Sequence, residues 1–115
     1  MAKIGIYLPK YRRQGNENLL RPVDEGTLRR ETLKITKLLT DLVGGCTSID
    51  VMGYYKFDDG FFSEAPTTEI YCFCDDKMTG KIASELKPLL TDIKLRLSQN
   101  SVGMYIDSTS KFIEV

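Results

Sequence analysis

The chain has 115 residues, of which 42% are hydrophobic and 28% are charged. These values predict one folded domain over residues 1–115 and exclude a disordered tail. Sixteen Lys and Arg balance sixteen Asp and Glu, which argues against direct nucleic-acid binding through bulk charge.

Charge is distributed unevenly along the chain. Residues 1–40 contain nine Lys and Arg against four Asp and Glu, whereas residues 41–76 contain one basic residue against eight acidic ones. If these segments lie on separate surfaces, the protein has a basic side and an acidic side, which suits head-to-tail self-association or an anionic ligand. If they face each other, they neutralise internally, and the sequence leaves both arrangements open.

The cysteines are odd in number, and neither a signal segment nor a membrane-length apolar run is recognisable. We therefore expect a cytoplasmic protein that does not enter a membrane and that keeps Cys46, Cys72 and Cys74 as thiols.

The first part of the chain predicts a strand, a connection and a helix. Residues 3–8 have strand composition and end at Pro9. Residues 9–22 show little periodicity and predict a long irregular connection, a kind of loop that often carries function. Leucine and isoleucine then recur at helical spacing from Asp24, a suitable N-cap, to the double glycine at 44–45, which is better suited to end a helix than to cradle a phosphate.

The second part predicts a hairpin, a second helix and a last strand. Residues 46–57 and 61–74 have strand composition around an Asp-Asp-Gly turn signal, with Pro66 as an interruption. Apolar residues spaced three and four apart predict a helix over 78–97, in which Pro88 should cause a kink or mark a boundary. Two further segments predict strands, residues 101–106 and a possible extra C-terminal strand at 111–115.

The predicted order is β-α-β-β-α-β, which is the ferredoxin-like α+β fold, an antiparallel sheet with two helices on one face. Alternation along 61–74 places Cys72 and Cys74 on one face and Tyr71 and Phe73 on the other. We expect self-association into a dimer or larger homo-oligomer, because uncovered sheet faces and unpaired edges invite pairing. Tyr71 and Phe73 would contribute apolar area to that interface.

The chain contains no histidine, which excludes Ser-His-Asp and Cys-His catalysis and any metal site that needs imidazole. Cys72 and Cys74 are two residues apart, and Cys46 could only be a third ligand, so the spacing does not match a zinc site. Buried, inert thiols are the favoured interpretation. We therefore assign no catalytic residue, no metal site and no cofactor.

The carboxylates of Asp58, Asp59 and Glu64 could pair as an acid and a base, hold a cation, or form an acidic protein-binding surface. The simpler interpretation is a solvated hairpin tip, because turns favour Asp. Asp75 and Asp76 are expected to cap the second helix and to place negative charge in its first turn.

The connection after the first strand contains the best candidates for a ligand site. Arginine side chains grip phosphate or carboxylate groups in a bidentate manner, and tyrosine can stack on a base. Asparagine supplies polar contacts to a base edge. The predicted ligand-binding residues are Tyr11, Arg12, Arg13, Asn16, Asn18, Arg21 and, from the hairpin, Tyr54. The alternative is a solvated loop whose arginines form surface ion pairs.

Residues 39–70 resemble a pattern found in a family of small bacterial and phage proteins. In that pattern a helix ends in a Phe-Gly-Gly-x-Thr turn, followed by a Gly-aromatic pair, an acidic Gly turn, a Glu and an apolar strand. The matching positions are Gly44, Gly45, Thr47, Gly53, Tyr54, Gly60, Glu64 and Ile70, with Gln99, Ser101 and Val102 before the last strand. Val43 stands in place of the usual Phe. The resemblance implies an α+β fold and a phage or mobile-element origin, and it implies no catalytic residues.

These observations favour a non-enzymatic, phage-encoded counter-defence protein that sequesters an anionic, nucleotide-like signalling ligand. The alternative is an inhibitor that uses its acidic face as a nucleic-acid mimic against a basic host protein, for example a CRISPR or other defence nuclease. A carboxylate- or cysteine-dependent enzyme is a third possibility.

Overall fold

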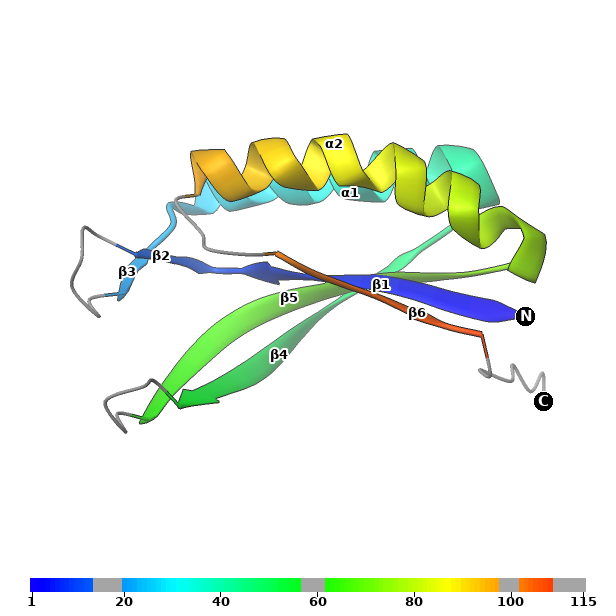
Figure 1. The fold of residues 1–115 in the computed structure, drawn as a ribbon. Helices are drawn as coiled ribbons and strands as arrows, with labels where there is room; N and C mark the ends of the chain where they lie inside the picture. Colours follow the sequence, from blue (N-terminus) through cyan, green and yellow to red (C-terminus); the bar gives the residue numbers. More distant parts are fainter. Residues whose placement is uncertain (14–19, 57–61, 98–101, 109–115) are drawn as a thin grey trace.

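The computed structural model describes residues 1–13, 20–56, 62–97 and 102–108. It is a two-layer α+β structure in which two antiparallel-running helices lie on one face of a four-stranded sheet (Figure 1). The strands of that sheet are β1 (Ala2–Pro9), β4 (Thr47–Lys56), β5 (Phe62–Cys74) and β6 (Gly103–Asp107), and the helices are α1 (Glu25–Val43) and α2 (Thr79–Arg96).

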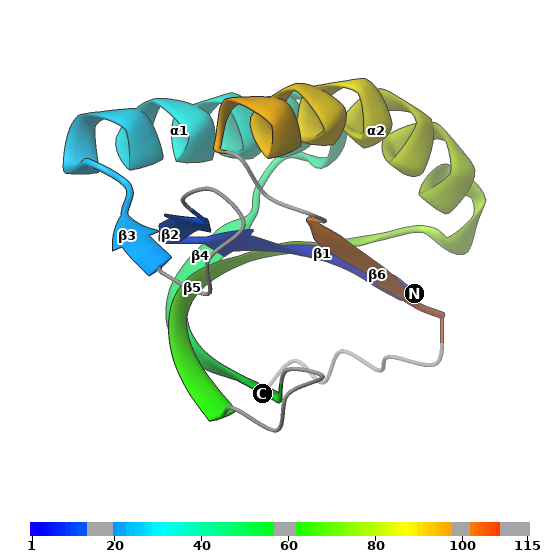
Figure 2. The ribbon, with the colours of Figure 1, turned by 60° about the vertical axis from the view of Figure 1, so that its left-hand side comes forward.

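The strand order is β4-β5-β1-β6, and every neighbouring pair is antiparallel. Together with the chain order, this arrangement confirms the predicted ferredoxin-like fold. β4 and β5 extend beyond the helices and curl away from them (Figure 2). The sheet therefore has a helix-covered face and an open, concave face.

The helix-covered face holds the core. Alternate residues of β1, among them Ile4 and Ile6, are fully buried, as is Ile70 on β5. They pack with Ile35 and Leu39 of α1 and with a stripe of α2. The α2 residues of that stripe are Ile82, Leu86, Leu90 and Ile93. Cys72 and Cys74 are buried on this face too, as their alternation predicted.

The helix ends follow their sequence signals in part. Asp24 caps α1, since its carboxylate accepts hydrogen bonds from the backbone N and hydroxyl of Thr27, and these bonds lower the pKa of Asp24. Gly44 ends α1 with φ of 89°, a left-handed conformation that favours glycine. Asp75, however, caps the short 3₁₀ turn η1 (Asp76–Met78), and α2 begins only at Thr79.

Two local predictions were wrong, and a third was wrong in part. Residues 9–22 are not wholly irregular, because β2 (Tyr11–Arg13) and β3 (Leu20–Pro22) pair as a small antiparallel ribbon. β5 runs through Pro66 without interruption, and the Pro66 carbonyl accepts a hydrogen bond from the Lys10 backbone N at 3.1 Å. Pro88 does not mark a boundary, because α2 continues past it to Arg96, and the kink that was the other expectation stays a prediction. The Asp-Asp-Gly turn and the C-terminal strand at 111–115 lie outside the described residues.

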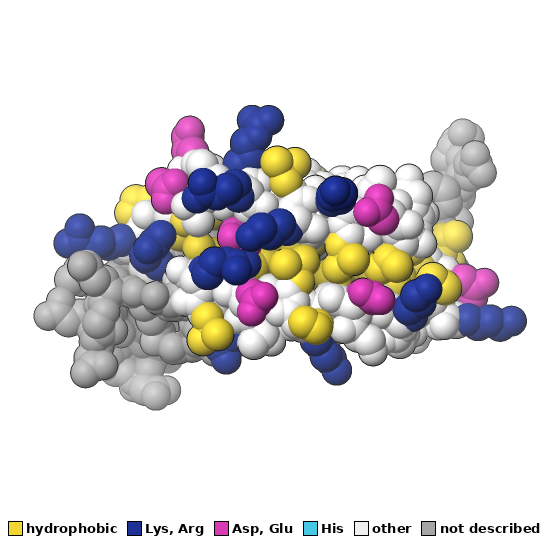
Figure 3. Space-filling model, turned by 90° about the horizontal axis from the view of Figure 1, so that it is seen from above, with side chains coloured by type: hydrophobic (Ala, Val, Ile, Leu, Met, Phe, Trp, Pro, Cys, Tyr) yellow, Lys and Arg dark blue, Asp and Glu magenta, His cyan; other side chains and the backbone are white. Residues whose placement is uncertain are grey.

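Ion pairs join the basic and acidic segments of the chain. Lys10 Nζ lies 2.6 Å from the Asp50 carboxylate, and Lys3 Nζ lies 3.7 Å from that of Glu69. The two segments therefore neutralise each other at these points. The outer surface of the helices carries Lys and Arg side chains with Asp and Glu among them (Figure 3). In the described part of the chain, no helix is long and apolar enough to cross a membrane.

Candidate functional site

The β2–β3 ribbon brings together two of the predicted ligand-binding arginines. Arg12 and Arg21 are direct partners across the ribbon, so they lie on the same face of it. Tyr11 is next to Arg12 and pairs with Pro22. A backbone hydrogen bond of 2.8 Å from Val23 N to the Lys10 carbonyl holds the base of the ribbon.

The charges of this arginine pair are uncompensated within the described structure. No carboxylate of the described residues forms an ion pair with Arg12 or Arg21, although Lys10 nearby is paired with Asp50. Like charges directly opposite on an antiparallel ribbon repel. Because the two arginines are cross-strand partners, a bound anion that contacts both would relieve this repulsion.

The other predicted ligand-binding residues are only partly described by the structure. Tyr54 lies on β4 and is 58% exposed. Arg13 lies on β2, and the position of its side chain is outside the described structure, as are Asn16 and Asn18.

The predicted protein-interface residues do not share one surface. Tyr71 and Phe73 are half-buried on the open face of the sheet, with ring centroids 5.9 Å apart. Glu64 pairs with Tyr54 across the hairpin, and alternation along β5 places it on the other face. Asp58 and Asp59 lie outside the described residues.

A second cluster, which we call the open-face cluster, was missed by the sequence analysis. It consists of Lys3 and Tyr7 on β1, Glu69 and Tyr71 on β5, and Tyr105 on β6. The Tyr105 hydroxyl donates a hydrogen bond to the Glu69 carboxylate. The Lys3 ammonium lies 4.2 Å from the centre of the Tyr71 ring, a cation–π distance, in addition to its ion pair with Glu69.

Gly5 makes this cluster possible. It lies on β1 between Tyr71 and Tyr105 in the sheet register, and a Cβ atom at this position would lie 2.3 Å from the Tyr105 ring. Without that atom, Tyr105 reaches across β1 to Glu69 on the strand beyond. A glycine inside a predicted strand often marks such a close approach, and Gly5 was the signal that could have revealed the cluster.

The open-face cluster is partly buried, which raises the pKa of one of its members, and it adjoins a hollow. The Glu69 side chain is only 12% exposed. Burial and the hydrogen bond to Glu69 raise the pKa of Tyr105 well above its ordinary value, so this hydroxyl remains a donor throughout the physiological range. A hollow of about 370 Å³ adjoins Glu69 and Tyr7 and extends along β4 past Gly53 to Tyr54. Its volume is within the range of small-molecule sites.

The cysteines and carboxylates that the structure describes form no further centre. Burial raises the pKa of Cys72 to about 11, which keeps it a thiol. The described residues contain no group of three or more Cys, Asp and Glu side chains placed to hold a metal ion.

Comparisons with known proteins establish the fold class. No protein-family model matches the sequence, and the search of curated proteins finds no match. A phage SAM lyase in complex with S-methyl-5′-thioadenosine is similar in structure, with a TM-score of 0.61 and 13% identity over 92% of this chain and 79% of that one. The periplasmic divalent cation tolerance protein CutA from Archaeoglobus fulgidus has a TM-score of 0.56 and 10% identity over 99% and 89% of the two chains. CutA1 from Ehrlichia chaffeensis has a TM-score of 0.55 and 10% identity over 96% and 83%.

These likenesses show that the chain shares the ferredoxin-like fold of small CutA-type proteins and of a phage enzyme. At 10–13% identity they do not transfer an activity, because one fold supports many functions.

Proposed function

We propose that the protein is a small, non-enzymatic binding protein for an anionic, nucleotide-like ligand. The observation that carries the proposal is the pairing of Arg12 with Arg21 on one face of the β2–β3 ribbon, without a carboxylate partner in the described structure. Guanidinium groups bind phosphate oxygens in a bidentate manner, and a bound phosphate would offset the repulsion between them.

The remaining predicted ligand residues do not all share the face of the arginine pair. Alternation along β2 places Tyr11 on the face of the ribbon opposite Arg12, while Asn16 and Asn18 belong to the connection between β2 and β3. The phage SAM lyase of similar fold holds a nucleoside, S-methyl-5′-thioadenosine, which supports a nucleoside-bearing ligand for this chain too. Sequestration of a defence signalling nucleotide by a phage-encoded protein in the host cytoplasm is the biological role that we infer.

Self-association belongs to the same proposal. The open face of the sheet exposes Tyr7 by 40% and Ile49 by 41%, and it carries the half-buried Tyr71 and Phe73. A second copy on this face would cover these side chains.

The test is native mass spectrometry of the freshly purified protein, followed by calorimetric titration with a panel of cyclic oligonucleotides. We expect a bound nucleotide whose affinity falls at least about 10-fold in the R12A/R21A variant, since each phosphate contact to a charged group contributes about 1.5–3 kcal/mol. R29A/K37A is the matched control, because it removes two exposed positive charges from α1. Equal loss in both variants, or no loss in R12A/R21A, would refute the site.

The alternative function, an inhibitor whose acidic face mimics nucleic acid, predicts a different result for these variants. It predicts salt-sensitive capture of a basic protein that is lost when Asp58, Asp59 and Glu64 are changed to amides, and that is unaffected in R12A/R21A.

A carboxylate-dependent enzyme is a second candidate, favoured by the open-face cluster. Glu69 is mostly buried beside the tyrosine rings of Tyr71 and Tyr105, and the Lys3 ammonium already occupies that environment, so the cluster suits a cationic group. A sulfonium substrate such as S-adenosylmethionine, on which the similar phage lyase acts by its name, has that charge. Release of methylthioadenosine by the wild type and not by Glu69→Gln would establish this activity in place of simple binding.

A further inference from the structure

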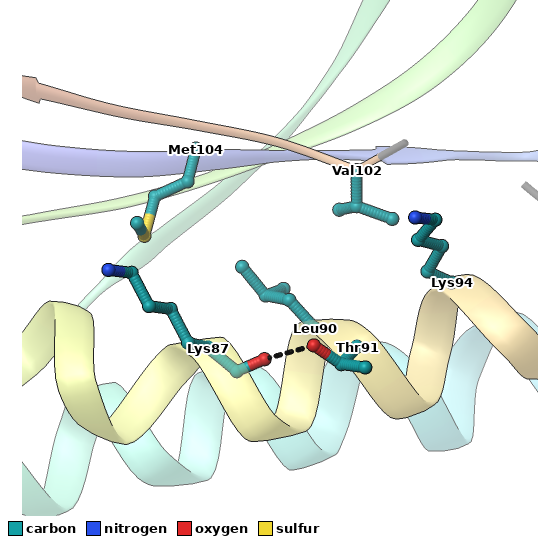
Figure 4. A pocket seen from close by; sticks show the side chains of 6 residues that line it. All are labelled: Lys87, Leu90, Thr91, Lys94, Val102 and Met104. Carbon is teal, nitrogen blue, oxygen red and sulfur yellow. Dashed lines mark hydrogen bonds between the residues drawn. The ribbon is translucent and has the colours of Figure 1, made fainter. Parts of the chain in front are cut away.

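A groove runs between α2 and the edge strand β6, on the side of the sheet opposite the open-face cluster. It has a volume of about 330 Å³ and is lined by Lys87, Leu90, Thr91, Lys94, Val102 and Met104. All four α2 side chains come from one side of the helix (Figure 4). The groove contains none of the residues assigned to the arginine pair.

The floor of the groove is apolar and incompletely covered. Leu90 is buried against the sheet, while Val102 and Met104 are partly buried against the core. Ile106, two residues further along the same side of β6, is 47% exposed. Among the described residues, β6 pairs with β1 on one side, and no described strand pairs with its other edge.

The rims of the groove are positively charged. Lys87 and Lys94 lie seven positions apart on α2, one at each end of the apolar floor (Figure 4). Neither forms an ion pair with a carboxylate of the described residues, whereas Arg96, two positions beyond Lys94, makes a bidentate pair with the buried Glu31. The cations at the groove are thus available to an anionic partner.

We propose that this groove binds an extended acidic segment of another protein, which adds to β6 as a further strand. Backbone groups of the segment would pair with the outer edge of β6, and an apolar side chain would lie over Leu90 and Met104. Acidic side chains on either side of it would reach Lys87 and Lys94.

The spacing of the lysines specifies the pattern of the segment. Seven residues of helix separate the two lysines by about 10 Å along the helix axis. Residues four apart on a strand lie about 13 Å apart on the same face. The lysine side chains are long and flexible enough to bridge the difference between the two spacings. The segment should therefore read acidic-x-apolar-x-acidic. A fatty acid has one charged end and would leave one lysine unpaired, so a segment with two charges fits the groove better.

The experiment is a selection of random nine-residue peptides on the purified full chain, followed by fluorescence polarisation with the selected peptide. We expect enrichment of the acidic-x-apolar-x-acidic pattern and binding that weakens at least about 10-fold in the K87E/K94E variant, since two ion pairs are reversed. The matched control is K77E/K81E, which makes the same charge change at exposed positions outside the groove and should bind within about 2-fold of the wild type. Hydrogen exchange at 103–107 should slow when the peptide binds.

Several results would overturn the proposal. Selection of no peptides, or of peptides without paired acidic residues, would remove the stated partner. Undiminished binding in K87E/K94E would place the peptide elsewhere. A change in oligomeric state on gel filtration in K87E/K94E alone would show that a second copy of the chain fills the groove. Nucleotide binding through Arg12 and Arg21 should be unaffected in K87E/K94E, so this proposal and the proposed function can fail separately.

Discussion

The two faces of the sheet use one backbone for different purposes. On the helix-covered face, alternate residues of β1 and β5 such as Ile4, Ile6 and Ile70 are fully buried. On the open face, the residues between them carry rings and charges, including Tyr7, Glu69 and Tyr71. The first face is held by burial of apolar area, and the second by a cation–π contact, an ion pair and a hydrogen bond between specific partners. The comparison teaches that stability and chemistry are separated by the strand alternation itself.

The same substitution on the two faces should give the largest contrast. Ile6→Ala removes a fully buried side chain and should lower the free energy of unfolding by about 2–5 kcal/mol, because it leaves a cavity. Ile49→Ala, on the open face where Ile49 is 41% exposed, should lower it by less than about 1 kcal/mol. Urea denaturation followed by circular dichroism measures both. Equal losses would show that the open face is covered in solution, as by a second copy.

Thiol reactivity should also distinguish the covered face from the surface. Raising the pKa of Cys72 from 9.0 to about 11 lowers its thiolate fraction at pH 8 about 100-fold, and its burial slows it further. Half-buried Cys46 should therefore be alkylated first by iodoacetamide, as shown by peptide mass mapping at short times.

The same raised pKa predicts a loss of stability in alkali. A group whose folded-state pKa is raised stabilises the fold fully below its unfolded value and loses this contribution as pH rises. The Cys72 contribution is thus lost from pH 9 towards pH 11.

The alkylation experiment has its own control. Denaturation in urea should abolish the difference in alkylation rate between Cys46 and Cys72. If Cys72 reacts as fast as Cys46 in the folded protein, the covered face opens readily.

The addition of a single carbon atom at position 5 should disrupt the open-face cluster. Gly5→Ala introduces a Cβ where the Tyr105 ring lies 2.3 Å away, so the ring must move and its hydrogen bond to Glu69 must break. We expect a loss of about 1–3 kcal/mol in urea denaturation, typical of overpacking.

Gly103→Ala is the matched control for this change, since its added Cβ would lie at an ordinary 3.5 Å from Tyr7. If the clash with the ring is the cause, Gly5→Ala should cost much less in a Tyr105→Ala background. A full cost in that background would assign the effect to the strand backbone instead.

The covered face was predictable from sequence and the open face was not. Alternation places Cys72 and Cys74 on one face and Tyr71 and Phe73 on the other, and the apolar character of free thiols favours the cysteine face as the inner one. Helical spacing gives the buried stripe that contains Ile35 and Leu39. Those patterns are local. The open-face cluster depends instead on which residue of β6 lies opposite Gly5, a long-range register that no local pattern contains.

The β2–β3 ribbon shows the same limit at shorter range. Its sequence has turn-forming and charged residues without strand alternation, so it was predicted to be irregular. The pairing of Arg12 with Arg21 became visible only once the register was known. Buried Glu31 was also missed, because its position on the covered side of α1 is explained by Arg96, 65 residues away.

The smallest expected effect concerns the charge pairs of the open face and of the β2–β3 ribbon. On the open face Lys3 lies beside Glu69, whereas Arg12 on the ribbon lies opposite another cation. Arg21→Glu would convert that like-charge pair into an opposite-charge pair and should raise the free energy of unfolding by about 0.2–1 kcal/mol. Arg12→Glu should do the same, and the double variant, which restores a like-charge pair, should return to the wild-type value. Nucleotide binding should fall in both single variants and fall further in the double variant. If the two arginines stabilised the fold, replacing either one would lower the free energy of unfolding. A higher free energy of unfolding together with weaker nucleotide binding would therefore show that the arginines serve ligand binding.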